Sequence, residues 1–576
     1  MRHPLQIRII NTLLFSALSM HPGLAQSGAS GLGFIAPMDI PLELAGNFME
    51  PRANHFHAGL DLRTQGREGI PVRAVADGWV SRIKISPYGY GKAVYIDHPN
   101  GYTTVYGHLQ QLSGTVGEAC VDQQYRLKDF SIDWTLEKGA IPLKQGEIFA
   151  LSGNTGGSGG PHLHFEVRRT KDQVALDPET FGIAVPDNKP PEILGVRLYP
   201  LADSSRVPPY PAKAAGFATE GINGFYQLKG GIALNAYGTV GLAVHVIDRY
   251  NANGAKCGPR SIELFVDSVS VFSSSFEELV FDVNRYCNAH MDYGQFKSNK
   301  LEYHRCYRLP HNKLRIYGKE AVMGRIELEP GQERRVWLRV TDAHGNTSHL
   351  RFTLHGASPS EANAWPVKRP EGSLFRYDAA NSIHEQDVRF ELPAMALYDD
   401  AFVQYARRPA AGRAIKHLHA IGDPLVPMHS PAELSIVYSG PSPEKAVVVS
   451  MDPDGSVGAS HGGKFDGGWV TASVKSFGTY TVMLDTVPPS ISNSDMRSSM
   501  IGQKSFTLRI ADDLSGISAW RGTLNGEWIL MEYDPKTKSL THVFDKQTSG
   551  AGRKDFRLTV TDEMGNASNY AHVFNR

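Results

Sequence analysis

The chain is dominated by short runs of alternating apolar and polar residues, separated by Gly, Pro, Asn and Asp. A period of two residues is typical of strands that bury one face. The stretch 94–105 is an example, and we expect its central Asn100-Gly101 pair to supply the positive φ angles of a tight hairpin turn. Long segments with helical periodicity are scarce. The sequence therefore predicts a mainly β protein.

Two segments share one internal organisation. Each begins with a Pro-Pro pair, at 190–191 and 488–489, and ends with Thr-Asp followed by a Gly-Asn turn, within 340–348 and 560–568. This ending suits the last hairpin of a β-sandwich. At 576 residues the chain is also too long for one core. We expect Ig-like β-sandwiches at 187–357 and 487–576, with a third β-rich sandwich domain at 365–486.

The first 25 residues have the features of an export signal. Arg2, His3 and Arg8 make a basic start, and 9–20 is mostly apolar but shorter than the roughly 20 residues that a bilayer-spanning helix needs. Gly23-Leu24-Ala25 offers a small-x-small cleavage site. We expect a signal peptide at 1–25, a mature chain in the periplasm or cell envelope, and no stable membrane insertion; the alternative is an uncleaved anchor.

Charge and cysteine content narrow the classes of partner. Lys and Arg total 59, as do Asp and Glu, so the formal net charge is zero. Nucleic-acid binders and polybasic membrane-surface proteins need an excess of cations, which argues against both. Four cysteines in an exported protein allow up to two disulfides. Three lie between 257 and 306, which favours one local bridge, but the pairing stays open among Cys120, Cys257, Cys287 and Cys306.

Histidines gather in three stretches, 55–61, 106–109 and 160–166. Side chains alternate along a strand, so His162 and His164 share one face. If 57–61 is extended, His57 and Asp61 share a face too, and Gly59 between them has no side chain to block an ion. Zinc accepts two His and one Asp with water in the fourth position, and it lowers the pKa of that water toward about 7.

The stretch Asn54-His-Phe-His-Ala-Gly-Leu-Asp61 resembles the H-x-x-x-D motif of the lysostaphin/LytM-type zinc endopeptidases. The segment 153–166 resembles their closing G-P-H-L-H-F-E signature, and 106–109 resembles their Y-x-H-L element. The resemblance covers about 50–180 and implies a zinc metallopeptidase domain at 26–186, with a groove-shaped antiparallel sheet. It implies one Zn²⁺ held by His57, Asp61 and His164, with His162 as general base and His108 polarising the water and stabilising the tetrahedral intermediate.

Other residues near these motifs are expected to have ordinary roles. The segment 113–143 is longer than in compact family members, and we expect an inserted loop with a hairpin that walls or covers the groove. We expect His55 and His98 to have surface or core roles, with His98 facing solvent, although His55 could support the site. Glu166 is expected to be an ion-paired strand residue. Arg52 and Arg63 are expected to be solvated, although either could hold a substrate carboxylate.

The resemblance implies an exported zinc endopeptidase that hydrolyses peptide cross-links of peptidoglycan, with a D-alanyl–diaminopimelate bond expected and oligoglycine bridges as the lesser alternative. A second hypothesis is a non-catalytic protein that binds peptidoglycan or activates an amidase, as in similar chains that have lost zinc ligands. Here every expected ligand is present, which favours the enzyme. In a third hypothesis, the sandwiches make the protein mainly an adhesion or tethering module; we expect them instead to position the peptidase domain and to offer a surface for an envelope partner.

Overall fold

The computed structural model describes residues 33–183, 185–208, 216–251, 254–365, 371–410 and 415–576. The expected mainly β fold is confirmed, and the longest helix in these ranges is α1 (Gly114–Leu127). No helix in the ranges is long and apolar enough to span a membrane. The predicted signal peptide lies outside the described residues.

The N-terminal part of the chain is built on an antiparallel sheet with the strand order β1-β4-β13-β8-β7-β6-β10. Along β13, Leu163, Phe165 and Val167 are fully buried in the apolar core, as strand alternation predicted. These strands are β1 (Leu44–Gly46), β4 (Leu60–Arg63), β6 (Gly78–Ile85), β7 (Lys92–Asp97), β8 (Tyr102–Gly107), β10 (Ile132–Thr135) and β13 (His162–Arg169). Smaller sheets pair β5 (Pro71–Arg73), β12 (Ile148–Leu151) and β9 (Gln111–Leu112), and β2 (Pro51–Arg52) with β3 (His55–Phe56).

Two local expectations need correction here. In the β7–β8 hairpin only Gly101 takes a positive φ, of 86°, whereas Asn100 does not. The segment 113–143 is no hairpin loop: it forms helix α1 and then β10 and β11 (Pro142–Leu143), which both pair with β6 and not with each other. Helix α1 contacts β9 and β12 and buries Val116 and Cys120, so the segment is an integral part of the fold.

The next part of the chain carries a 12-stranded sheet with the order β20-β19-β15-β16-β17-β27-β26-β21-β22. Strand β16 pairs with β15 at one end and with β17 at the other, which connects all these strands. The Ig-like sandwich at 187–357 therefore stays a prediction. The strands are β15 (Glu192–Pro200), β16 (Gly216–Ile222), β17 (Phe225–Leu228), β18 (Leu234–Ala236), β19 (Gly238–Arg249), β20 (Lys256–Cys257), β21 (Ser261–Val266), β22 (Val269–Ser275), β24 (Tyr303–Arg305), β25 (Ile326–Leu328), β26 (Glu333–Thr341) and β27 (Thr347–Gly356).

The first two parts of the chain are continuous in space. Strand β14 (Ala175–Leu176) follows β13 and pairs with β23 (Glu278–Leu279), so the N-terminal sheet extends into the second part. One apolar cluster includes buried residues of both, such as Phe56 and Phe276, whose rings lie 5.8 Å apart. Helical segments near this junction are η1 (Pro178–Phe181), η3 (Phe281–Tyr286), α2 (Cys287–His290) and α3 (Tyr293–Asn299), with α4 (Pro359–Ala364) farther along the chain.

The C-terminal part contains two pairs of antiparallel sheets. Residues 381–484 form two five-stranded sheets around Phe390 and Phe477, and 490–575 form two four-stranded sheets around Phe506 and Phe556. The first pair comprises β29 (Asn381–His384), β30 (Val388–Leu392), β32 (Tyr405–Pro409), β33 (Ile415–Ile421), β34 (Ala432–Val437), β35 (Ala446–Met451), β36 (Val457–Ser460), β37 (Lys464–Asp466), β38 (Trp469–Val474) and β39 (Gly478–Leu484). The second comprises β40 (Ser490–Asn493), β41 (Ser505–Ala511), β42 (Ile517–Leu524), β43 (Glu527–Trp528), β44 (Glu532–Asp534), β45 (Ser539–Val543), β46 (Arg553–Asp562) and β47 (Ala567–Asn575).

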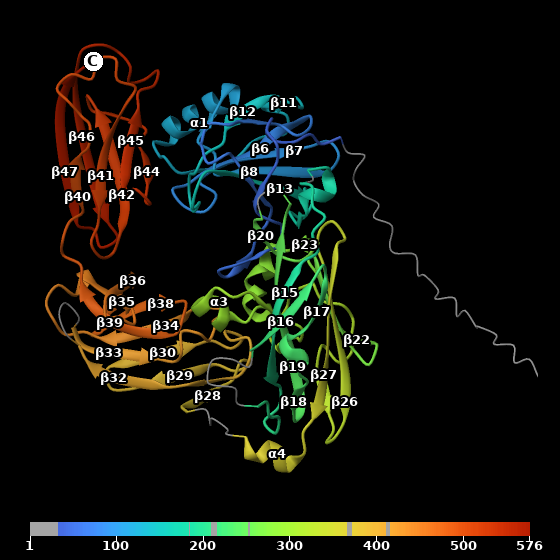
Figure 1. Cartoon of the computed structure of the whole chain (residues 1–576). Coiled ribbons are helices and arrows are strands. Elements are labelled where there is room, and N and C mark those ends of the chain that lie inside the picture. The colour runs from blue at the N-terminus through green and yellow to red at the C-terminus, as the bar shows by residue number, and fades with distance from the viewer. Residues whose placement is uncertain (1–32, 184, 209–215, 252–253, 366–370, 411–414) are drawn as a thin grey trace, which may run out of the picture.

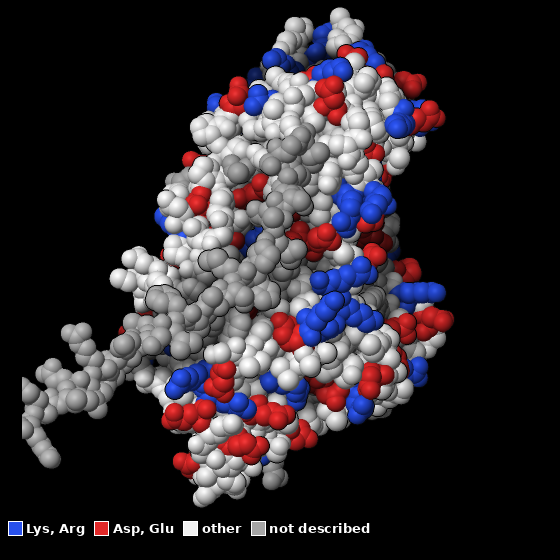
Figure 2. Space-filling model, turned by 90° about the vertical axis from the view of Figure 1, so that its right-hand side faces the viewer, with Lys and Arg blue, Asp and Glu red and all other residues white. Residues whose placement is uncertain are grey.

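The last pair of sheets lies against the N-terminal part of the chain, next to helix α1 (Figure 1). The Lys546 ammonium lies 2.6 Å from the Asp122 carboxylate in helix α1, and the rings of Tyr125 and Trp528 meet edge to face at 5.1 Å. Figure 2 shows Lys and Arg interspersed with Asp and Glu on the face turned to the viewer.

The disulfide expected between 257 and 306 is not present. All four cysteines lie within the described residues and are buried free thiols. Burial raises the pKa of Cys120 to about 12, and it raises the pKa of Cys257, Cys287 and Cys306 still further. These thiols therefore act as apolar core groups.

Candidate metal centre

Three of the residues singled out in the sequence converge on one buried point. In the antiparallel pair β4–β13, Asp61 lies directly opposite His164. His57 lies between β3 and β4 and faces the same point. One ligand atom from each lies within 4.8 Å of the others, and all three residues are at most 4% exposed.

The contact atoms are defined by short distances. His57 Nε2 lies 3.0 Å from His164 Nδ1 and 3.1 Å from Asp61 Oδ1. His164 Nδ1 lies 3.0 Å from the same Asp61 oxygen. The three atoms thus form a nearly equilateral triangle on the face of β4 and β13 opposite the core residues Leu163 and Phe165.

The opposite ring nitrogens establish which atoms carry lone pairs. His57 Nδ1 lies 2.8 Å from the Asn47 carbonyl, which can only accept, so this nitrogen donates and Nε2 is left with a lone pair. His164 Nε2 lies 2.8 Å from a Glu166 carboxylate oxygen, which leaves the lone pair on Nδ1. Two nitrogen lone pairs and a carboxylate oxygen therefore face one another. This donor set fits a divalent cation of the zinc type.

The electrostatics favour positive charge at this point. Although burial opposes ionisation, the charge of His57 and the hydrogen bonds that His162, His164 and His57 donate when they are protonated hold the pKa of Asp61 well below its usual range. Burial also opposes a charge on His164, but hydrogen bonds and charge from Asp61 and Glu166 raise its pKa to about 9. Without a metal ion, a proton between these ring nitrogens and Asp61 therefore supplies the positive charge at this point.

Glu166 orients His164, a role that goes beyond the ion-paired strand residue expected. Its carboxylate is fully buried and accepts hydrogen bonds from His164, from the Tyr90 hydroxyl and, at 2.5 Å, from Arg168 Nε. Burial disfavours its charge, but Arg168 and His164 lower the pKa of Glu166 to about 2. The Tyr90 ring also stacks on His164 with centroids 4.8 Å apart. Such partners fix the tautomer and ring orientation of a metal ligand.

Arg52 and Asn47 contact residues of the triangle, and the sequence predicted neither contact. Arg52 was expected to be solvated, but its Nη2 lies 2.5 Å from Asp61 Oδ2 and 2.7 Å from Glu50. It occupies the outer oxygen of Asp61 and leaves Oδ1 for the triangle. The alternation of charged residues around 50–52 does not indicate that Arg52 contacts Asp61.

Two further histidines line the same point. His162 Nδ1 lies 2.8 Å from the Gly160 carbonyl, so its lone pair is on Nε2, which is buried without a hydrogen-bond partner and lies 3.3 Å from Asp61 Oδ1. His108 Nδ1 likewise lies 2.8 Å from the Thr155 carbonyl, and its ring is 4.8 Å from that of His162. Burial, with the charges of His164 and His162, lowers the pKa of His108 to about 3, so this ring is neutral.

The remaining candidates lie apart from the triangle. His55 is exposed and contacts the Ala53 carbonyl, and Arg63 donates to the Leu44 carbonyl. The expectation that His98 faces solvent is wrong. It is 3% exposed, and its two ring nitrogens form hydrogen bonds with the Asp77 carbonyl and the Thr104 hydroxyl.

Gly59 is required for a reason other than leaving room for an ion. A Cβ at this position would lie 2.2 Å from the Phe165 carbonyl oxygen and 2.8 Å from Glu166 Cγ. The backbone at Gly59 therefore touches β13, which sets the distance from His57 to His164. Gly156 (φ 71°) similarly allows the loop 153–160 to pack on the backbone of Gly91, which holds Thr155 against His108.

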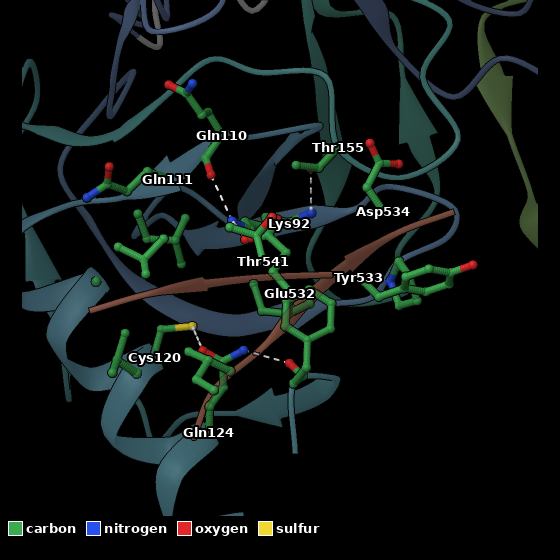
Figure 3. Close-up of a pocket in the computed structure, with 18 of the residues that line it drawn as sticks. Lys92, Gln110, Gln111, Cys120, Gln124, Thr155, Glu532, Tyr533, Asp534 and Thr541 are labelled. Atoms are coloured by element: carbon green, nitrogen blue, oxygen red, sulfur yellow. Dashed lines mark hydrogen bonds and ion pairs between the residues drawn. The ribbon is translucent and has the colours of Figure 1, made fainter. Parts of the chain in front are cut away.

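A cavity of about 1030 Å³ lies beside this centre, between the N-terminal part and the last pair of sheets (Figure 3). Lys92 and Thr155 line one wall, and Glu532 lines the other. The Lys92 ammonium lies 2.7 Å from Glu532 and 2.8 Å from the Gln110 carbonyl. None of the five site residues lines the cavity, which shares only the loop 154–156 with the centre.

Comparison with known proteins gives two family matches. Residues 55–124 match the model of peptidase family M23, and 372–485 match that of the Zu5-like domain. The chain is 33% identical over 132 residues to the DD-carboxypeptidase/endopeptidase Mpg of Neisseria meningitidis serogroup B, covering 23% of this chain and 24% of that protein. It is 30% identical over 113 residues to the murein hydrolase activator EnvC of Escherichia coli, covering 19% and 21%.

Among solved structures, the catalytic domain of lysostaphin from Staphylococcus simulans is similar, with 25% identity, a TM-score of 0.18, and coverage of 23% of this chain and 87% of that domain. The curated relatives are matched over about a quarter of their own length. The M23 match, over residues 55–124, lies in the N-terminal part and includes His57, Asp61 and His108. The M23 match confirms the resemblance stated from the sequence.

Proposed function

This chain carries a domain of peptidase family M23, and on that premise we propose that it is a zinc endopeptidase that hydrolyses peptide cross-links of peptidoglycan. The observation that carries the proposal is the triangle of His57, Asp61 and His164, whose lone pairs face one another within 3.1 Å. The substrate class is supported by the names of relatives that act as DD-carboxypeptidase/endopeptidase or activate murein hydrolases. A D-alanyl–diaminopimelate bond is the proposed target.

A zinc ion bound by these three residues would polarise the scissile carbonyl and acidify the attacking water. His162 is the proposed general base. The Gly160 carbonyl fixes its tautomer, so its Nε2 lone pair points into the site and can take the proton of the water and pass it to the leaving amine. His108 presents the same lone pair and can orient the water; it can stabilise an oxyanion only after it gains a proton.

The alternative is a non-catalytic activator, a role named for the relative from Escherichia coli. An activator needs neither a metal ligand set nor a base. Here Glu166, Asn47 and Arg52 orient the three ligands, and His162 and His108 are held with lone pairs toward them. Buried polar contacts that orient a complete ligand set and two histidines favour the enzyme over the activator.

Export to the periplasm or cell envelope completes the proposal. It rests on the basic and apolar pattern of 1–25 and on the location of peptidoglycan. N-terminal sequencing of the mature protein from a periplasmic extract tests it, with Gln26 expected as the first residue. A protein that keeps residues 1–25 would instead indicate the anchor.

The decisive experiment compares the full chain with His162→Ala on purified muropeptide dimers, with zinc content measured by mass spectrometry. The wild type should hold one zinc and release monomers, whereas His162→Ala should keep zinc and lose cleavage, because the substitution spares the ligands. His55→Ala, at an exposed position, is the matched control and should cleave normally. Zinc-loaded wild type that leaves dimers intact would refute the enzyme and favour the activator.

A further inference from the structure

A second kind of site lies outside the histidine cluster, where the chain enters the first large sheet of the second part. Asp187, Asp248 and Asp342 place carboxylate oxygens within 4.8 Å of one another. Asp187 lies before the Pro-Pro pair at 190–191, Asp248 near the end of β19, and Asp342 directly after β26. Three segments that are distant in sequence therefore bring three acids together.

The central residue of this cluster has no partner for either oxygen. Asp248 is fully buried, and both of its carboxylate oxygens, like Oδ2 of Asp187, make no hydrogen bond. A buried carboxylate without a partner is strongly disfavoured unless a cation or a proton compensates it. Burial, with the charges of Asp342 and Asp187, raises the pKa of Asp248 to about 8. The neighbouring carboxylates therefore disfavour a negative charge on Asp248 unless a cation or a proton binds there.

The loop that follows β26 fixes the orientation of the Asp342 carboxylate. One of its oxygens accepts from the backbone N–H groups of His344 and Asn346, and the other accepts from the Asn346 side chain at 2.8 Å. These bonds point the carboxylate toward Asp248 and fix the Gly-Asn turn that the sequence singled out. The turn thus holds a carboxylate at the cluster and also closes a hairpin.

A related arrangement lies at the entry to the last pair of sheets, although its third clustered acid is Asp513 and not Asp562, the counterpart of Asp342. Asp485 lies before the Pro-Pro pair at 488–489, Asp512 follows β41, and Asp562 ends β46. Asp485, Asp512 and Asp513 also bring oxygens within 4.8 Å, and Asp485 is fully buried with Oδ1 unpartnered. Asp562 is held by Asn566 just as Asp342 is held by Asn346. The recurrence supports a shared ligand.

We propose that each of these two carboxylate clusters binds one calcium ion where a linker enters its sheets. The donors that define both clusters are all oxygens. Hard divalent cations such as calcium prefer oxygen ligands, whereas zinc is usually bound by nitrogen and sulfur. Calcium tolerates irregular shells of carboxylate and carbonyl oxygens, whereas magnesium requires a near-ideal octahedron and keeps several waters, which the burial of Asp248 and Asp485 disfavours. Because Asp187 and Asp485 belong to linkers, the ions would fix the linkers to the sheets that follow.

Calorimetric titration of calcium chloride into the chelator-treated full chain, with one equivalent of zinc restored, tests the proposal. We expect two ions per chain, with dissociation constants of about 0.1–1 mM or tighter, as in extracellular modules. Asp248→Asn should remove one ion, Asp512→Asn the other, and the double variant both. Asp555→Asn, at a partly exposed carboxylate that pairs with Arg557, is the matched control and should keep two.

Folding is checked in calcium-free buffer, where Asp248→Asn should melt at or above the wild-type temperature because it removes repulsion among buried carboxylates. In calcium the wild type should gain thermal stability that the double variant lacks. Asp187→Asn, at a partly exposed linker position, provides a second variant if Asp248→Asn fails to fold. Absence of calcium binding by the wild type at millimolar concentration, two ions in Asp248→Asn, or equal affinity for magnesium would overturn the assignment.

Discussion

The side chain of Asn47 forms two reciprocal hydrogen bonds with the backbone of Gly258, 211 residues away, at 2.9 and 2.8 Å. The carbonyl of the same Asn47 accepts the hydrogen bond from His57 Nδ1. Asn284 of η3 similarly bonds both the N–H and the carbonyl of Phe56, next to that histidine. The second part of the chain thus fixes the backbone that presents one ligand of the candidate metal centre.

Asn47→Ala should weaken zinc binding although it removes no ligand. The substitution leaves the carbonyl that orients His57 but frees it from Gly258, and loss of an outer-shell partner typically costs about 10-fold or more in metal affinity. Competition with a chromophoric chelator measures the affinity. His55→Ala is the control and should bind zinc as the wild type does; unchanged affinity in Asn47→Ala would contradict the positioning role.

Gly59→Ala should separate the strands that carry the ligands. Its Cβ would overlap the Phe165 carbonyl at 2.2 Å, and relief of such overpacking costs about 1–3 kcal/mol of unfolding free energy. Urea denaturation measures the loss, and zinc content should fall with it. Gly159→Ala meets open space and should be close to neutral. Equal stability of the two variants would show that β4 and β13 can adjust.

Acid should destabilise the protein through a pair of histidines outside the metal centre. His304 Nδ1 lies 3.0 Å from His290 Nε2, and burial, with the charge of His245, lowers the pKa of His304 to about 3. The unfolded chain binds this proton more readily, so stability is complete above about pH 6.5 and falls at lower pH, by about 1.4 kcal/mol per pH unit for one such group.

Urea denaturation between pH 7 and pH 5 measures this slope. His304→Gln should make the slope shallower, because the glutamine does not titrate. The exposed His384→Gln variant should leave the slope unchanged. Wild-type stability that stays constant over this range would contradict the expectation.

The contact between the N-terminal part and the last pair of sheets should depend on charge. Glu532→Lys places a second ammonium beside Lys92 and removes a contact of 2.7 Å across the cavity wall. Small-angle scattering should then show a larger radius of gyration, with a smaller increase for the wild type in high salt, because salt screens partly exposed ion pairs. Asp555→Lys, on a strand outside this contact, is the control and should leave the radius unchanged.

The sequence predicted the mainly β fold from strand alternation, which also placed His57 with Asp61 and His162 with His164 on shared faces. The choice of His57, Asp61 and His164 came from the resemblance to the zinc endopeptidases. Their roles as ligands stay proposals. Helix α1 was missed because Gly114 and Gly117 weaken its helical pattern, although Val116 and Cys120 recur at a spacing of four. Asn47, Arg52 and the buried position of His98 depend on contacts between distant segments, which no local pattern reports.

The pairing of β14 with β23 has a practical consequence for anyone who shortens this protein. Cutting after residue 186 would leave β14 as an open strand edge and would strip Asn47 and Phe56 of their partners on Gly258 and Asn284. An exposed edge invites pairing with other chains. The smallest soluble fragment that carries the candidate metal centre should therefore extend to about residue 357, and a shorter fragment should aggregate.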